Sequence, residues 1–166
     1  KKRNWTLRHD VLLAAGLLIA VPLATWYFLH VRDQHYFRNP LSVPLSLSAN
    51  FGELRKDHFH MGLDIRTRGR ENLPVHAAAD GYVSAIIIEE EGYGNAIEIT
   101  HPNHTTTLYA HLNRFFDSLQ QYVSQVQYLS KQWEQQLRFL PGQFPVKKAQ
   151  FIAYSGNTGH SEAPHL

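Results

Sequence analysis

The sequence predicts a mainly β domain with one α-helix, preceded by an N-terminal membrane helix. Three features of the 166-residue chain support this fold class. An uncharged apolar run lies near the N-terminus, β-branched stretches separated by turn dipeptides follow Phe51, and one stretch has apolar residues at helical spacing. We therefore expect a basic stub with a membrane segment (1–30), a linker containing Pro40 and Pro44 (31–49), and a folded domain (50–166).

The membrane segment is predicted at Val11–Leu29, where 19 residues carry no charge. A helix of this length spans about 28 Å, close to the thickness of the bilayer core. Four basic residues precede the run (Lys1, Lys2, Arg3 and Arg8), which places the N-terminus in the cytoplasm and the domain outside. A cleaved signal peptide and a buried core helix are the alternatives. The first lacks a small-residue cleavage site, and the second does not suit apolar residues on all sides.

Five strands are predicted in the domain, at Leu73–Ala79, Gly81–Glu89, Asn95–His101, Thr105–His111 and Gln150–Tyr154. Asp80-Gly81, the EEGYGN stretch at 90–95 and Pro102-Asn103 supply turns between them. By the period of two, Thr107, Tyr109 and His111 share one face of their strand, and Leu108 lies on the other.

One helix is predicted between the fourth and fifth strands. Apolar residues recur there at three- and four-residue steps (Leu119, Tyr122, Val126, Leu129, Trp133, Leu137 and Leu140). Asp117 is a candidate cap for its start, and Pro141-Gly142 ends it. We expect a helical insertion packed on the sheet.

The composition favours metal chemistry. Eleven histidines raise the expectation of a metal site, because histidine is the commonest metal ligand. The absence of cysteine excludes disulfides, thiolate zinc sites and a cysteine nucleophile. A net charge of +2 is too weak to indicate nucleic acid binding.

Three short clusters carry the candidate chemistry. They are His60 to Asp64 (HMGLD), Tyr109 to Leu112 (YAHL), and the Ser155 to Gly159 turn (SGNTG) followed by His165-Leu166. Imidazole nitrogens and carboxylate oxygens suit zinc. Each cluster alone fits an ordinary hydrogen-bonded or surface histidine equally well.

In this order and spacing the clusters resemble the M23, or lysostaphin-like, family of zinc metallopeptidases. That family shows His-x-Gly-x-Asp, Tyr-x-His-Leu and Ser-Gly-x-Thr-Gly, followed by His-Leu-His. Flanking stretches agree (VHAAADGYV at 75–83, GYGN at 92–95, PVKK at 145–148), so the resemblance covers residues 50–166. Two positions depart from it, since Ala149 and Ala163 stand where glycine is usual.

The resemblance implies an antiparallel β-sheet groove domain with His60 and Asp64 as zinc ligands and His111 and His165 as catalytic residues. The third ligand would stand two positions after His165, beyond Leu166. Since Lys1 is not a methionine and Leu166 falls inside a motif, we expect the chain to be part of a longer protein.

The implied function is a zinc-dependent endopeptidase that hydrolyses peptide cross-links of bacterial peptidoglycan through a metal-activated water. Its partners would be stem peptides or cross-bridges of the cell envelope. We expect it to face the periplasm or the exterior, anchored in the inner membrane by its N-terminal helix or secreted.

Two other functions stay open from the sequence: a non-enzymatic module that binds wall or activates a hydrolase, and a peptidase that acts on proteins. The remaining histidines of the domain fall outside the motifs and are expected on the surface or in support of the ligands (His58, His76, His101, His104 and His160). His58 could also line the groove. The carboxylates of 89–91 are expected at a solvated hairpin tip.

Overall fold

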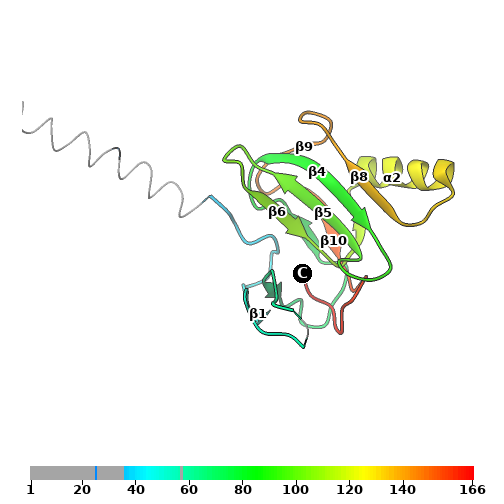
Figure 1. Cartoon of the computed structure of the whole chain (residues 1–166). Coiled ribbons are helices and arrows are strands. Elements are labelled where there is room, and N and C mark those ends of the chain that lie inside the picture. The colour runs from blue at the N-terminus through cyan, green and yellow to red at the C-terminus, as the bar shows by residue number, and fades with distance from the viewer. Residues whose placement is uncertain (1–24, 26–35, 57) are drawn as a thin grey trace, which may run out of the picture. The chain divides into compact units, whose positions relative to one another are not determined.

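The computed structural model describes residues 25, 36–56 and 58–166. Its folded unit runs from Arg38 to Leu166 (Figure 1). Apart from Thr25, the predicted membrane segment Val11–Leu29 lies outside the described residues. Within the described residues, no helix is both long enough and apolar enough to cross a membrane. The membrane segment therefore stays a prediction.

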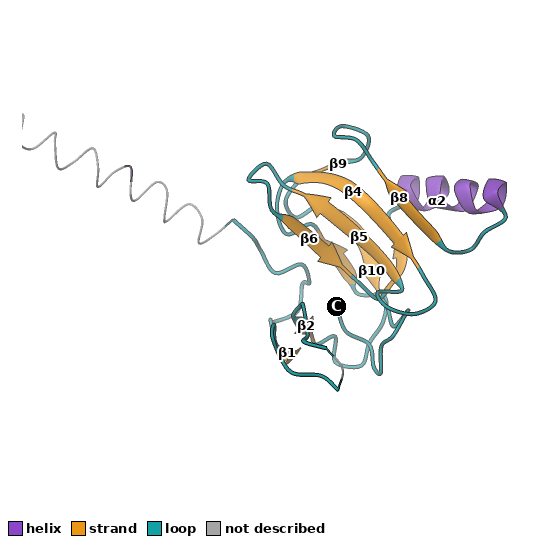
Figure 2. Ribbon diagram, in the orientation of Figure 1, coloured by secondary structure: helices purple, strands orange, loops and turns teal. Residues whose placement is uncertain are grey.

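The folded unit contains three antiparallel sheets and one helix, as Figure 2 shows. The largest sheet has the order β6 (Thr106–Tyr109), β5 (Asn95–Thr100), β4 (Gly81–Ile88) and β8 (Gln135–Arg138), and β9 (Pro145–Val146) also pairs with β4. A second sheet has the order β3 (Pro74–His76), β10 (Phe151–Ser155) and β7 (Leu112–Phe115). A small third sheet pairs β1 (Leu47–Ala49) with β2 (Asp64–Ile65). The predicted mainly β class with one helix is confirmed.

The core is built around β4 and β5. Val83 and Ile86 on β4, and Ile97 and Ile99 on β5, are fully buried. β-Branched side chains suit a pleated and covered surface, so this pairing follows from the sequence pattern. The predicted turn at 90–95 joins the two strands, with Gly92 and Gly94 at positive φ.

The polar face of β6 points into the molecule. Tyr109 is 4% exposed and its hydroxyl accepts a hydrogen bond from the Ala78 amide at 2.8 Å. Burial raises the pKa of this tyrosine. His101 is also buried, with Nδ1 2.7 Å from the Asp80 carbonyl and Nε2 2.9 Å from the Thr107 hydroxyl. The expectation of a surface or ligand-supporting His101 was wrong, because internal partners satisfy both ring nitrogens.

The helix is shorter than predicted. α2 spans Asp117–Ser130 and ends at Lys131, which adopts the left-handed conformation. The residues beyond it form β8, whose backbone pairs with the edge of β4. Asp117 is a first-turn residue rather than the cap, a place where a carboxylate suits the helix dipole.

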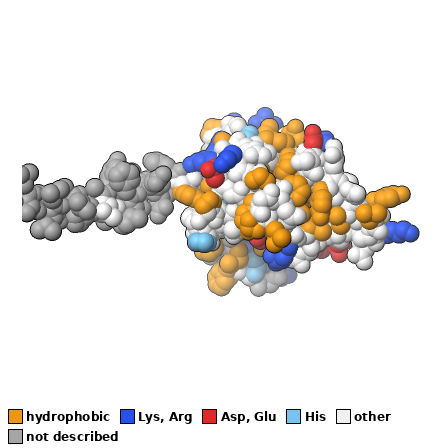
Figure 3. All heavy atoms as spheres, turned by 90° about the horizontal axis from the view of Figure 1, so that it is seen from above, with side chains coloured by type: hydrophobic (Ala, Val, Ile, Leu, Met, Phe, Trp, Pro, Cys, Tyr) orange, Lys and Arg blue, Asp and Glu red, His pale blue; other side chains and the backbone are white. Residues whose placement is uncertain are grey.

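Only the first half of the predicted apolar face of α2 packs on the protein. Leu119 and Val123 are buried, and the Tyr122 ring contacts that of Phe139, just after β8, at 5.5 Å. Tyr128 and Leu129, further along α2, are 83% and 71% exposed. Figure 3 shows hydrophobic side chains at several places on one face of the molecule.

Part of the predicted linker belongs to the folded unit. Leu41 is 2% exposed and forms an antiparallel bridge with Val75. Further along, β1 pairs with β2. The stretch from Arg38 to Ala49 is therefore packed on the domain and does not act as a free spacer.

Candidate metal centre and catalytic histidines

His60 and Asp64 form a close pair at the start of β2. Nε2 of His60 lies 3.0 Å from Oδ1 of Asp64, and the two side chains are 18% and 20% exposed. A β-carbon added to Gly62 would lie 3.8 Å from the same Nε2. Position 62 therefore lies beside the His60 ring, where a β-carbon would be in ordinary van der Waals contact with it.

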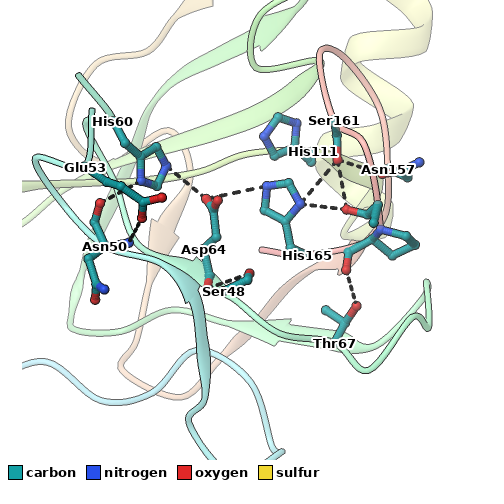
Figure 4. A network of polar contacts seen from close by, with 12 residues as sticks. Ser48, Asn50, Glu53, His60, Asp64, Thr67, His111, Asn157, Ser161 and His165 are labelled. Atoms are coloured by element: carbon teal, nitrogen blue, oxygen red, sulfur yellow. Dashed lines mark hydrogen bonds and ion pairs between the residues drawn. The ribbon is translucent and has the colours of Figure 1, made fainter. Parts of the chain in front are cut away.

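His165 reaches this pair from the other end of the chain (Figure 4). Leu166 and Ile65 exchange two backbone hydrogen bonds, of 2.7 and 3.1 Å, and His165 forms an antiparallel bridge with Arg66. This pairing holds Nε2 of His165 at 3.6 Å from Oδ1 of Asp64. One carboxylate oxygen thus has two imidazole nitrogens beside it.

His111 completes the group from the turn after β6. Its backbone has a φ of 57°, and its amide donates to the Tyr93 carbonyl at 2.9 Å. Its ring centre lies 4.6 Å from that of His165. Burial lowers the pKa of His111, and the hydrogen bond with the Thr158 carbonyl opposes this effect. The imidazole is therefore neutral at neutral pH.

Two glycines let the segments around His111 touch backbone to backbone. A β-carbon on Gly94 would lie 2.4 Å from the Thr158 carbonyl carbon, and one on Gly159 would lie 2.3 Å from the Gly94 nitrogen. Both glycines have positive φ. The Thr158 hydroxyl accepts from the Asn95 amide and donates to the Leu112 carbonyl, both at 3.0 Å. The tip of the β4–β5 hairpin and the SGNTG turn therefore form one unit.

All three histidines present the same ring nitrogen to a backbone carbonyl. Nδ1 of His60 lies 3.0 Å from the Asn50 oxygen, Nδ1 of His111 2.8 Å from the Thr158 oxygen, and Nδ1 of His165 2.7 Å from the Ala163 oxygen. A carbonyl oxygen only accepts hydrogen bonds, so each Nδ1 carries a hydrogen. In the neutral rings the lone pair is therefore on Nε2.

This arrangement fits a cation between the side chains. With the hydrogen on Nδ1, Nε2 of His60 directs a lone pair at a carboxylate oxygen 3.0 Å away, and a proton or a metal ion between the two atoms removes that repulsion. Carbonyl-anchored histidines are typical of metal ligands. Among the residues that the structure describes, no group of three or more histidine, cysteine, aspartate or glutamate residues is placed to hold a metal ion. His60 and Asp64 are donor types that suit zinc, and their assignment as ligands stays a prediction.

Arg55 was not singled out from the sequence. Its guanidinium lies 3.3 Å from Oδ2 of Asp64, the carboxylate oxygen that the histidines leave free. The backbone amide of Arg55 donates to the His58 carbonyl, which anchors it in a turn. The cation compensates the charge of Asp64 and holds its carboxylate in one orientation.

The four predicted site residues come together, although they lie up to 105 positions apart in the sequence (165 − 60 = 105). Sequence reasoning missed the groups that orient them. These are the carbonyl oxygens of Asn50, Thr158 and Ala163, the Arg55 guanidinium and the Ser161 hydroxyl. Backbone carbonyls leave no signal in side-chain identity. Ser161 lies inside the stretch that joins two of the motifs.

The chain is similar in sequence to known peptidases. The model of peptidase family M23 matches residues 58–138, which include His60, Asp64 and His111. The DD-carboxypeptidase/endopeptidase Mpg of Neisseria meningitidis serogroup B is 32% identical over 107 residues, 64% of this chain and 19% of the relative. An uncharacterized metalloprotease of Haemophilus influenzae is 28% identical over 137 residues, 79% of this chain and 24% of the relative. The chain thus spans about a fifth of the length of these relatives.

Solved structures share the fold. A variant of the catalytic domain of the prophage-encoded M23 protein EnpA from Enterococcus faecalis superposes with a TM-score of 0.53 at 20% identity, covering 78% of this chain and 82% of that chain. A zinc containing peptidase from Vibrio cholerae gives 0.52 at 21% identity, covering 80% and 35%. These structures show the fold, and the family-model match over residues 58–138 together with the relatives supports the assignment of this chain to peptidase family M23.

Proposed function

We propose that this chain carries the active site of a zinc-dependent endopeptidase that hydrolyses peptide cross-links in bacterial peptidoglycan. The observation that carries the proposal is the gathering of three histidines around Asp64, each with its Nδ1 against a backbone carbonyl. The match to family M23 supports a peptidase, and the similarity to a DD-carboxypeptidase/endopeptidase of Neisseria supports a wall substrate.

His60 and Asp64 are the proposed zinc ligands. Both donors are oriented by other groups, His60 by the Asn50 carbonyl and Asp64 by Arg55. Bound zinc would supply Lewis acidity toward a peptide carbonyl and a water molecule. The orientation of these donors by the two groups would reduce the ordering that accompanies metal binding.

The backbone pairing of Leu166 indicates where a third ligand would lie. Leu166 pairs with Ile65, so the next position in this antiparallel pairing stands opposite Asp64. Its side chain would share the face that carries Asp64 and His165. A histidine at this position would complete a set of three protein donors.

His111 and His165 are the proposed acid and base. Each is held through Nδ1 and keeps the Nε2 lone pair for proton transfer. One ring would accept the proton of the attacking water at Nε2. The other, once protonated, would donate to the leaving amine or to the oxygen of the tetrahedral intermediate.

The proposed location is the cell envelope. A wall substrate lies outside the cytoplasm, and the uncharged run at Val11–Leu29 with its preceding basic residues supports export on an anchor or a signal segment. A membrane fraction washed with high salt should retain the protein at unchanged mass if the segment anchors it. A shorter soluble form would instead show cleavage.

The function is tested with purified peptidoglycan. Released peptides are identified by mass spectrometry, with and without a chelator, for the wild-type protein, His111→Ala and the matched surface variant His104→Ala. We expect zinc-dependent cleavage that His111→Ala loses and His104→Ala keeps. Wall binding without cleavage by the zinc-loaded protein would instead support a non-enzymatic module, and cleavage of proteins but not wall would contradict the substrate.

The position of the third ligand is tested separately by zinc titration. The chain is lengthened after Leu166 by His-Ser-Ser in one form and by Ala-Ser-Ser in the other. We expect zinc affinity to rise at least about tenfold in the histidine form only. Equal affinities would contradict the proposed third position.

A further inference from the structure

The segment that runs from the SGNTG turn to His165, residues 157–165, is held by hydrogen bonds. Thr67 is fully buried, and its hydroxyl donates to the Pro164 carbonyl at 2.8 Å. The Ser161 amide donates to the Gly159 carbonyl at 3.0 Å. This segment, residues 157–165, therefore has a defined path over the site, and its side chains have fixed positions relative to His165.

The Ser161 hydroxyl lies at the centre of this segment (Figure 4). Its Oγ is 2.7 Å from Oδ1 of Asn157, 3.0 Å from the Ala163 carbonyl and 3.2 Å from Nδ1 of His165. A hydroxyl has one hydrogen to donate and two lone pairs. The hydroxyl can therefore donate to only one of these partners. The choice of partner decides whether it donates to or accepts from His165.

The direction follows from the partners. The shortest contact is to the amide oxygen of Asn157, which only accepts, so the Ser161 hydrogen points there. The hydroxyl oxygen is then free to accept from Nδ1 of His165, the nitrogen that already carries a hydrogen toward the Ala163 carbonyl. Nδ1 thus has two acceptors, one from the backbone and one from a side chain.

We propose that Ser161, held by Asn157, is a positioning residue for His165. The inference rests on the proposed function only in taking His165 as a catalytic residue. A single acceptor two residues away in the same exposed loop lets the ring swing about that contact. A second, partly buried acceptor fixes the plane of the ring, so Nε2 stays directed at Asp64. Ser161 also favours the tautomer with hydrogen on Nδ1.

The test compares Ser161→Ala with Ser161→Thr and Asn157→Ala. Ser161→Thr keeps the hydroxyl, and Asn157→Ala removes only the group that orients it. Ser124→Ala is the matched control, because that serine is on the exposed face of α2. Two readouts are taken at one pH: kcat and KM for wall cleavage, and the ¹⁵N NMR shifts of the His165 ring, which report the tautomer without turnover.

We expect Ser161→Ala to lower kcat about 10- to 100-fold with little change in KM, and to shift the ¹⁵N signals toward a mixture of tautomers. Ser161→Thr should restore both, Asn157→Ala should give a smaller loss, and Ser124→Ala should change neither. A Ser161→Ala ring with wild-type ¹⁵N shifts at temperatures well below unfolding would overturn the inference. So would a Ser161→Thr protein as impaired as Ser161→Ala. Because the NMR comparison needs no activity, it decides the role of Ser161 even if wall is not the substrate.

Discussion

The central sheet and the segment that carries the predicted metal ligands are held by different forces. On β4 and β5, Ile86 and Ile97 are completely buried. In the segment 50–64, by contrast, Phe59 and Met61 on either side of His60 are 61% and 72% exposed. The sheet is stabilised by apolar burial, whereas His60 is held by single hydrogen bonds such as that to the Asn50 carbonyl. The predicted ligands thus lie on the part of the fold that burial stabilises least.

One catalytic candidate, His111, lies on the other side of this division, whereas His165 pairs with Arg66 beside Asp64. His111 directly precedes β7, and its amide is bound to the tip of the β4–β5 hairpin through the Tyr93 carbonyl. The fold therefore joins a well-buried half that carries His111 to a more exposed half that carries His60 and Asp64. Metal bridging the ligands would add stability where the polypeptide supplies little.

The largest expected effect is on wall cleavage and on the zinc that stays bound in the histidine variants. His111→Ala and His165→Ala should each lower wall cleavage by about 10²- to 10⁴-fold while zinc stays bound, because neither is a proposed ligand. His60→Ala should lose the metal as well as the activity. Elemental analysis of the purified variants checks this division. Loss of zinc in His111→Ala or His165→Ala would place that histidine among the ligands.

The next effect is a difference in the free energy of unfolding between substitutions in the sheet and in the segment 50–64. Ile97→Ala in the sheet should lower the free energy of unfolding by about 2–5 kcal/mol, because it leaves a cavity in a closed core. Phe59→Ala removes a larger side chain from the segment 50–64. It should nevertheless change the free energy of unfolding by less than about 0.5 kcal/mol, because Phe59 is 61% exposed. Urea unfolding of both variants measures the contrast. Similar losses in the free energy of unfolding would show that the segment 50–64 is packed as tightly as the sheet.

A smaller effect concerns a strained position next to the sheet. Ala149 has a φ of 71°, a conformation that costs a residue with a β-carbon about 1–2 kcal/mol. Ala149→Gly should therefore raise the free energy of unfolding by about 0.5–1 kcal/mol after the greater flexibility of glycine in the unfolded chain is counted. Ala163→Gly is the control, because Ala163 lies in the segment 157–165 and does not have a positive φ. This substitution should not raise the free energy of unfolding. A melting temperature of Ala149→Gly at or below that of the wild type would contradict the strain.

The smallest effect is a pH dependence of stability from His111. Burial lowers its pKa in the folded protein, whereas the unfolded chain takes up a proton near the ordinary pKa of about 6.5. Its contribution is therefore fully present above that pH, and it is lost as the pH falls below it toward the folded-state pKa. His111→Gln should flatten the acid side of the stability curve. An unchanged slope between wild type and variant would show that His111 is not the group responsible.

The parts of the fold that local pattern determines could be predicted. Apolar, β-branched stretches predicted β4 and β5, and turn dipeptides placed the breaks at Asp80-Gly81 and Pro102-Asn103. The second half of α2 could not be predicted in this way. Its apolar spacing continues through Leu137, but the open edge of β4 offered those residues backbone partners in an extended form.

The sequence also did not predict which histidine is buried or how the histidine rings at the candidate site are oriented. Nothing in the local sequence distinguishes His101, which is buried between the Asp80 carbonyl and Thr107, from the exposed His104. The motif spacing located the four site side chains. It could not give their tautomers, because these depend on carbonyl groups that come close only in the folded chain.

The backbone contact between Gly94 and Gly159 has a consequence for anyone who modifies this protein. Most β-hairpin tips tolerate inserted tags or loops, but an insertion at 92–94 would separate the tip from the SGNTG turn and remove the Tyr93 carbonyl from His111. The exposed turn at 102–104 meets no such constraint. Labels, fusion partners and purification tags are therefore better placed at 102–104, because the 92–94 tip is in close backbone contact with the SGNTG turn.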